Sequence, residues 1–165
     1  MTVLAIDPGP EQSAFVLWDD ERVLRHGKAN NTGLLEEIAE GFFAFNAEHL
    51  LLEEIASYGM PVGREVFQTV RWAGRFEQCA ALSGWGPHQI HYLPRREVKL
   101  HLCHSARAND ATIRQALIDR FGGKDNAIGK KSAPGPLYGV KADEWQALAL
   151  AVTFHDQQQQ QAVAG

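Results

Sequence analysis

The sequence has few cysteines, no long apolar run and no excess of positive charge. Its 165 residues include two cysteines, Cys79 and Cys103, and this number is too small for a disulfide framework. The longest apolar runs, such as 147–152, are far shorter than the ~18 residues that a membrane-spanning helix requires. No basic segment followed by an apolar segment opens the chain. We therefore expect a soluble cytoplasmic protein with no membrane association.

Length and composition indicate one folded domain. Domains commonly span roughly 100 to 200 residues, and 45% apolar residues are enough to build a sizeable core. We expect this domain to cover residues 1–154. Residues 155–165 include the run Gln157–Gln161, have little to bury, and are expected to form a flexible tail.

The formal net charge of −4 combines segments of opposite sign. Residues 1–58 carry 3 basic and 11 acidic side chains, whereas residues 95–141 carry 10 basic and 4 acidic ones. Residues 142–165 carry no basic residue and 3 acidic ones. A basic segment between acidic ends can attract a polyanion despite the negative total, although a solvated helical surface would show the same excess. The charge pattern alone leaves both interpretations open.

Hydrophobic periodicity and turn residues predict an α/β fold. Short apolar segments bounded by turn residues predict strands over residues 2–6, 12–18, 22–28, 49–55 and 89–93. Helical spacing predicts helices over about 64–82, 94–102 and 141–154. It predicts two more helices, each with a candidate N-cap. One is capped by Asn31 or Thr32 and includes Phe42 and Phe45, and the other is capped by Asn109 or Asp110 and includes Phe121. Residues 122–140 hold five glycines and two prolines, and we expect them to form a mobile surface loop.

Acidic residues stand at the ends of three apolar segments. Asp7 ends the first expected strand, Glu53 and Glu54 end the leucine-rich strand, and Asp143 and Glu144 open the last helix. Carboxylates partly removed from water need a compensating cation or hydrogen-bond donors, and Mg²⁺ prefers such oxygen ligands. Turn formation, solvent exposure and the helix dipole explain the same residues without a metal. Because strand side chains alternate, only one of Glu53 and Glu54 faces a given side of the sheet, and periodicity does not say which.

The order of the expected elements and four short segments resemble one known family over residues 2–154. The segments are Leu4–Gly9, Leu51–Ile55, Arg96–Lys99 and Ala142–Ala151. They are similar to the conserved segments of the RuvC-like Holliday junction resolvases, most of all to forms carried by phages and prophages. The resemblance implies a ribonuclease H-like fold, with a mixed five-stranded sheet of three antiparallel strands followed by parallel strands, flanked by helices.

The resemblance also implies roles for individual residues. Asp7, Glu53 and Asp143 match catalytic metal ligands of the family, and Lys99 matches a catalytic cation near the scissile phosphate. The implied cofactor is Mg²⁺, for which Mn²⁺ substitutes. Further basic residues would bind backbone phosphates without reading bases, and these are Arg95, Arg96, Arg107, Lys130 and Lys131.

The chain departs from the pattern of bacterial members at two positions. Gln146 stands where a further aspartate is usual, so the fourth metal ligand is either this weaker amide oxygen or the carboxylate of Glu144. Ala56 stands where those proteins tend to carry an aromatic wedge that enters the junction. Tyr58 or Met60 on the following loop could take over this contact with DNA.

The implied activity is Mg²⁺-dependent hydrolysis of a phosphodiester in Holliday junctions or other branched DNA. The products would carry a 5′-phosphate and a 3′-hydroxyl, and the role would be in recombination, repair or phage DNA processing in the cytoplasm of a bacterium or an infected host. Family members act as homodimers, and the wide apolar surface of helix 64–82 is compatible with an interface, although an ordinary core would produce it too. The alternative is a branched-DNA-binding module of the same fold that has lost cleavage, a hypothesis motivated by Gln146.

Overall fold

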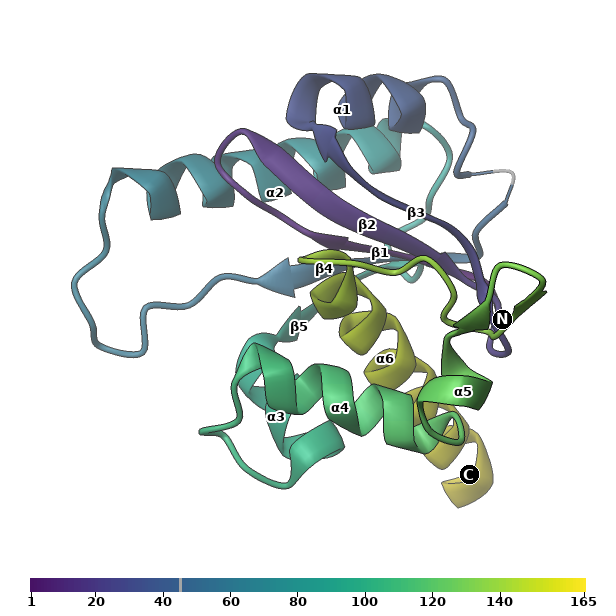
Figure 1. Ribbon diagram of the computed structural model, residues 1–165. Coiled ribbons are helices and arrows are strands. Elements are labelled where there is room, and N and C mark those ends of the chain that lie inside the picture. Colours follow the sequence, from purple (N-terminus) through teal and green to yellow (C-terminus); the bar gives the residue numbers. More distant parts are fainter. Residues whose placement is uncertain (45) are drawn as a thin grey trace.

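Five strands form one mixed sheet at the centre of the computed structural model, which describes residues 1–44 and 46–165 (Figure 1). The strands are β1 (Val3–Asp7), β2 (Gln12–Trp18), β3 (Val23–Asn30), β4 (His49–Glu54) and β5 (Ile90–Pro94), and their spatial order is β3-β2-β1-β4-β5. β2 pairs antiparallel with β1 and β3, whereas β4 pairs parallel with β1 and β5. The expected sheet of three antiparallel strands followed by parallel strands is therefore confirmed.

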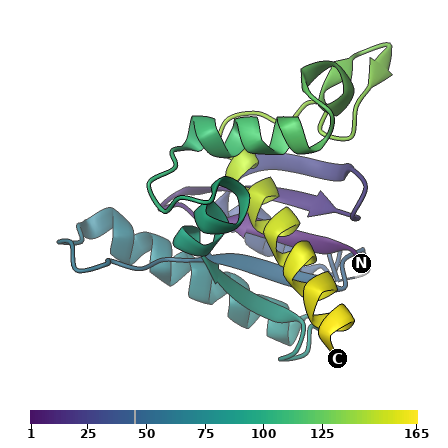
Figure 2. The ribbon, with the colours of Figure 1, turned by 90° about the horizontal axis from the view of Figure 1, so that it is seen from below.

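Helices cover both faces of this sheet (Figure 1; Figure 2). One face carries α1 (Asn31–Ala39) and α2 (Arg64–Leu82), and the other carries α6 (Glu144–Ala164) with α3 (Arg95–Cys103) and α4 (Asp110–Arg120) beside it. Between α4 and α6 the chain forms the short helix α5 (Lys124–Ala127) and a hairpin of β6 (Gly129–Lys130) and β7 (Ala133–Pro134).

Side-chain alternation along the strands divides the core into two layers. Val3 and Ala5 of β1 pack in the layer of α6, whereas Leu4 and Ile6 pack in the layer of α1 and α2. Helix α6 is buried from Glu144 to Phe154 because its alanines and leucines let it lie directly on the sheet. As Figure 1 shows, this helix begins beside the carboxyl end of β4.

Helix α1 begins with a different cap from the predicted one. The N-cap is Asn30, whose side-chain oxygen accepts a hydrogen bond of 2.9 Å from the backbone N–H of Thr32. The prediction of Asn31 or Thr32 as the cap was therefore wrong. Asn31 is instead buried and uses its side chain elsewhere, as described below.

Helix α1 also ends before the predicted aromatic residues. Gly41 adopts a φ of 77°, which ends the helical path of the chain after Ala39. Phe42 is consequently exposed, and Phe43 fills the core in its place. The predicted helical residue Phe45 lies outside the described residues.

Residues 122–140 contain a short helix and a hairpin, so the expectation that the whole segment forms a loop was wrong, whereas its mobility stays a prediction. Apolar side chains tie the segment to the core, since Ala127 and Leu137 are fully buried and the N–H of Leu137 donates to the carbonyl of Ala127 over 2.8 Å. The carbonyl of Pro136 also accepts from the N–H of Val23 over 2.9 Å. The segment thereby covers the start of the edge strand β3.

Helix α6 continues to Ala164, about three turns beyond its predicted end. Asp156, which was assigned to the tail, accepts hydrogen bonds of 2.6 Å from Arg120 and His101. Burial raises the pKa of Asp156, but these two partners outweigh it and hold the pKa below its ordinary value. The flexibility of the residues beyond Asp156 stays a prediction. No helix in the described part of the chain is both long and apolar enough to cross a membrane.

Candidate active site

Asp7 and Glu53 lie at the carboxyl ends of neighbouring parallel strands. Ile6 of β1 pairs with Leu52 of β4, so the same register places Asp7 opposite Glu53 one residue further on. Both residues belong to the side of the sheet that faces α6, because they follow Ala5 and Leu51 by two positions. The side chain of Glu53 is only 8% exposed.

Glu54 follows the alternation of β4 onto the opposite side of the sheet. It shares that side with Leu50 and Leu52, which pack in the layer of α1 and α2, and it is exposed. The two glutamates that periodicity could not separate therefore differ in both position and burial. Glu53 is the one that lies with Asp7.

A small buried network shapes the turn that follows Asp7. Ser13 donates to Oδ1 of Asn31 over 2.6 Å, the N–H of Gly9 donates to Ser13, and Asn31 donates to the carbonyl of Gly9 over 2.9 Å. A Cβ atom on Gly9 would lie 2.2 Å from the carbonyl oxygen of Gln12, so only glycine fits there. These contacts hold the end of β1, and the sequence pattern did not predict them.

The Asp7–Glu53 pair carries more negative charge than its surroundings compensate. Burial, together with the charge of Glu53 and a hydrogen bond to it, raises the pKa of Asp7 to about 8. Asp143 raises this pKa further, whereas Arg95 lowers it. The pair therefore holds a proton near neutral pH unless another cation replaces it.

Arg95, at the start of α3, is the cation that contacts this pair. Its guanidinium lies 3.6 Å from Oε2 of Glu53 and 2.5 Å from Oδ1 of Asp110. Burial lowers the pKa of Arg95, but Glu53, Asp110 and Asp7 outweigh it and raise the pKa above its ordinary value. Arg95 was predicted to contact backbone phosphates, and the structure brings it to the carboxylates themselves.

Lys99 lies one helical turn beyond Arg95 and is half-buried. Burial raises the pKa of the Cys103 thiol, and the charge of Lys99 lowers it in part, so Lys99 lies near Cys103. Arg95, rather than Lys99, is among the residues whose charge acts on Asp7. The catalytic role of Lys99 stays a prediction.

Asp143 immediately precedes α6 and lies close enough to Asp7 for its charge to act there. Its side chain is 52% exposed, and its Oδ2 accepts a hydrogen bond of 2.5 Å from Nζ of Lys28 on β3. The three predicted metal ligands thus gather at one end of the sheet. Asp7 and Glu53 form a pair there, and Asp143 is bound to a lysine.

The two candidates for a fourth ligand occupy different surroundings. Glu144 is 2% exposed and its Oε2 lies 2.7 Å from Nδ1 of His26 and 2.9 Å from the N–H of Lys141. Gln146 is 7% exposed and borders a cleft of about 540 Å³ that Asp143 also borders. Gln146 is therefore the candidate that shares a cleft with Asp143, whereas the carboxylate of Glu144 is already bound to His26 and Lys141.

The chemistry of these side chains fits a hard divalent cation. All three predicted ligands are carboxylates, and the raised pKa of Asp7 reflects a charge that such a cation would neutralise. Within residues 1–44 and 46–165, however, no group of three or more histidine, cysteine, aspartate or glutamate side chains is arranged closely enough to hold an ion. The ion pair with Lys28 holds Asp143, and like-charge repulsion disfavours its approach to the other two.

The predicted DNA contacts divide into separate regions of the surface. Arg96 and Arg107 are exposed at the start of α3 and in the loop between α3 and α4, and Tyr58 is 61% exposed on the loop before α2. Lys130 and Lys131 lie on the β6–β7 hairpin, beyond the other end of α4 (Figure 1; Figure 2). Arg96, Arg107 and Tyr58 therefore lie on the side of the molecule that carries the candidate metal ligands, whereas Lys130 and Lys131 do not.

The cleft beside Asp143 contains two basic residues that the sequence did not single out. Arg114 and Lys141 border it together with Trp145, and the guanidinium of Arg114 lies 5.2 Å from the centre of the Trp145 ring. Both residues belong to the basic segment 95–141. Charge counting could find this segment, but it could not show which of its members face the site.

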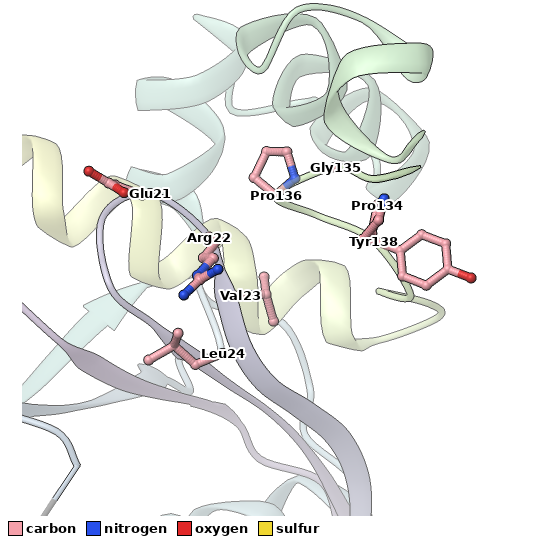
Figure 3. Close-up of a pocket in the computed structure, with 8 residues that line it drawn as sticks. All are labelled: Glu21, Arg22, Val23, Leu24, Pro134, Gly135, Pro136 and Tyr138. Atoms are coloured by element: carbon pink, nitrogen blue, oxygen red, sulfur yellow. The ribbon is translucent and has the colours of Figure 1, made fainter. Parts of the chain in front are cut away.

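A cavity of about 590 Å³ lies on another part of the molecule. It is bordered by Glu21–Leu24 of the β2–β3 hairpin and by Pro134–Pro136 and Tyr138, and Figure 3 shows the residues of both segments. These residues are distinct from every candidate site residue. The cavity therefore offers no support for the predicted chemistry.

Comparison with known proteins confirms the fold. No protein-family model matches the chain, and no curated protein matches it. Among solved structures, it is similar to Thermus thermophilus RuvC and to T. thermophilus RuvC in complex with Holliday junction substrate. Each has 20% sequence identity and a TM-score of 0.66, with 93% of this chain and 92% of the other covered. The chain therefore has the RuvC-like, ribonuclease H-like fold that its sequence indicated.

Proposed function

We propose that this protein is a Mg²⁺-dependent endonuclease that cleaves Holliday junctions or other branched DNA. The observation that carries the proposal is the gathering of Asp7, Glu53 and Asp143 at one end of a RuvC-like sheet. The similarity to a RuvC structure that contains a Holliday junction substrate supports this class of DNA. The proposed setting is recombination, repair or phage DNA processing in the cytoplasm of a bacterium or an infected host.

Asp7, Glu53 and Asp143 would hold the metal ions, and Gln146 is the proposed source of a further oxygen. Bound Mg²⁺ would supply an activated water and stabilise the attacking and leaving oxygens of the phosphodiester. Arg95, at 3.6 Å from Glu53, can hold that carboxylate in place or meet the negative charge of the phosphate. Lys99 is proposed to stabilise the developing charge from one turn further along α3.

The DNA backbone is proposed to lie across the start of α3 and the cleft beside Asp143. Arg96 and Arg107 are exposed near the first, and Arg114 and Lys141 border the second. Such contacts neutralise phosphates without reading bases, so they suit recognition of DNA structure. Lys130 and Lys131 could reach only a second arm of a branched substrate, since their hairpin lies at the other end of α4.

We further propose that the protein acts as a homodimer that uses an exposed face of α2. Phe67 is 62% exposed and Val70 is 48% exposed, although Ala73 and Phe76 of the same helix are buried. Large apolar side chains exposed on one helix face favour a protein partner. Sedimentation should give a dimer for the wild type and a monomer for Phe67→Asp; a monomeric wild type would exclude this interface.

A non-cleaving DNA-binding module is the second candidate, and Gln146 favours it. An amide at the proposed fourth position binds a divalent cation more weakly than a carboxylate does. Such a module would bind branched DNA through the same basic residues. It would leave the DNA intact at every Mg²⁺ or Mn²⁺ concentration.

The decisive experiment is incubation of the protein with an end-labelled four-way junction and Mg²⁺. We expect paired nicks with 5′-phosphate and 3′-hydroxyl ends, and Asp7→Asn should bind the junction without cutting it. A linear duplex of the same sequence is the control for structure selectivity. Binding without nicking by the wild type would favour the second candidate, and absence of both would exclude the proposed function.

A further inference from the structure

The carboxylate of Glu144 is buried, and one of its two oxygens, Oε2, makes two contacts. It accepts a hydrogen bond of 2.9 Å from the backbone N–H of Lys141, and it lies 2.7 Å from Nδ1 of His26. The residue as a whole is 2% exposed. Burial of a carboxylate without hydrogen-bond partners would cost folding free energy. The two contacts therefore indicate a structural role for Glu144.

The contact between Glu144 and Lys141 closes a turn around a strained residue. Ala142 adopts a φ of 48°, a left-handed conformation that costs a residue with a Cβ atom about 1 kcal/mol. The N–H of Glu144 also donates to the carbonyl of Lys141 over 3.0 Å, so backbone and side chain both span the turn. The residue that follows Ala142 is Asp143, and the turn therefore sets the direction of that side chain.

His26 links this turn to the edge strand β3. Gly139, just before the turn, packs on the imidazole, since a Cβ atom there would lie 3.1 Å from Nε2 of His26. Lys28, two residues further along β3, contacts Asp143. Strand residues two apart share one side of the sheet, so β3 holds the start of α6 at two adjacent points.

We propose that Glu144 and His26 are positioning residues that hold the turn at Ala142 so that Asp143 stays near Asp7 and Glu53. The inference rests on the proposed function, in which Asp143 is a metal ligand. It assigns Glu144 a role outside the metal site and leaves Gln146 as the further ligand. Neither positioning residue touches the substrate.

The test is the affinity of the metal-free, full-length protein for Mn²⁺. The electron paramagnetic resonance signal of the unbound ion measures this affinity. Glu144→Ala and His26→Ala should each weaken binding about 10-fold or more, the size typical of groups that orient metal ligands. Glu144→Gln should bind within about 3-fold of the wild type, because its amide oxygen can accept both hydrogen bonds that Oε2 accepts. Equal losses in Glu144→Gln and Glu144→Ala would overturn the proposal, since a direct ligand would need the carboxylate.

A second variant addresses the turn itself. Ala142→Gly in the Glu144→Ala background should recover part of the lost Mn²⁺ affinity, because glycine adopts a positive φ without the cost of a Cβ atom. Thermal unfolding of each variant checks that it folds, and a purely structural role would give no such recovery. Failure of the double variant to bind better than Glu144→Ala would contradict the positioning role.

Two further variants separate this inference from the proposed function. Asp143→Asn should weaken Mn²⁺ binding; if it does not, the metal site itself is misassigned. Arg25→Ala is the matched control, because it removes a 2.7 Å ion pair with Glu37 from the same strand, one position from His26. Arg25→Ala should bind Mn²⁺ as the wild type does, and a loss equal to that of His26→Ala would show a general effect of β3.

Discussion

Nζ of Lys28 lies 2.5 Å from Oδ2 of Asp143, so the edge strand β3 holds the carboxylate that precedes α6. The two residues are 115 positions apart in the sequence. Their side chains are 44% and 52% exposed, which limits the strength of the pair through solvent screening. The lysine nevertheless occupies an oxygen that a divalent ion would use.

Lys28→Ala should therefore strengthen Mn²⁺ binding to the metal-free protein. Removal of the competing ammonium frees Asp143 and makes the site more negative. Because an exposed ion pair stabilises by about 1 kcal/mol or less, we expect the Mn²⁺ affinity to rise about 2- to 5-fold. Titration calorimetry measures the affinity directly. Weaker binding by Lys28→Ala would mean that the lysine orients Asp143 and does not compete for it.

The raised pKa of Asp7 predicts that the metal-free protein loses stability as the pH rises. The pKa is 3.8 for an ordinary aspartate and about 8 for Asp7 in the fold, so the stabilising contribution is fully present below pH 3.8 and is lost as the pH rises through about 8. Asp7→Asn should abolish this loss. We expect the variant to gain about 1 to 3 kcal/mol relative to the wild type between pH 5 and pH 8.

Urea unfolding at several pH values in the presence of EDTA measures this difference. Addition of Mg²⁺ at pH 8 should stabilise the wild type and leave Asp7→Asn nearly unchanged, because the ion replaces the proton that the pair holds. A wild type whose stability does not change between pH 5 and pH 8 would contradict the shifted pKa.

The alternation along β4 predicts opposite outcomes for its two glutamates. Glu53→Gln should abolish junction cleavage and retain junction binding, since Glu53 lies with Asp7 on the side of α6. Glu54→Gln, one residue away and exposed on the other side, should cleave at a rate within about 3-fold of the wild type. Single-turnover cleavage of a four-way junction separates the two, and the reverse result would mean that the register of β4 is wrong.

Junction binding should depend steeply on salt despite the net charge of −4. Each neutralised phosphate adds about 0.9 to the slope of log affinity against log salt concentration, so Arg96→Ala with Arg107→Ala should lower the slope by about 2. Fluorescence anisotropy between 50 and 200 mM salt provides the measurement. An affinity that does not change with salt would mean that residues 95–141 do not face the DNA.

Several strands and helices were predicted closely, because apolar periodicity and turn residues are local features of the sequence. β2 and α2 have the predicted bounds, Gln12–Trp18 and Arg64–Leu82. The errors fall where distant contacts decide the structure. Gly41 ends α1 before Phe42, and the burial of Ala127 and Leu137 gives regular structure to a segment rich in glycine and proline.

The candidate site was predicted in part for the same reason. Asp7, Glu53 and Asp143 follow apolar segments that a single sequence reveals, and the resemblance to a family named them. The contacts of Arg95 with Glu53 and of Lys28 with Asp143 could not be predicted, because they depend on how α3 and β3 lie against the carboxylates. The only sequence signal for Lys28 is a basic residue on a polar edge strand, and this is common on any surface.

The sequence by itself determined the order of strands and helices and the carboxylates at their ends, because apolar period and turn chemistry act over a few residues. Only the tertiary structure decided on which side of the sheet Glu53 and Glu54 lie. It also decided that Arg95 contacts Glu53, that Lys28 contacts Asp143, and that His26 contacts Glu144. Those contacts depend on how the strands pair and on how α6 packs across the sheet. Such contacts join residues about 40 to 120 positions apart, a separation over which local sequence pattern carries no information.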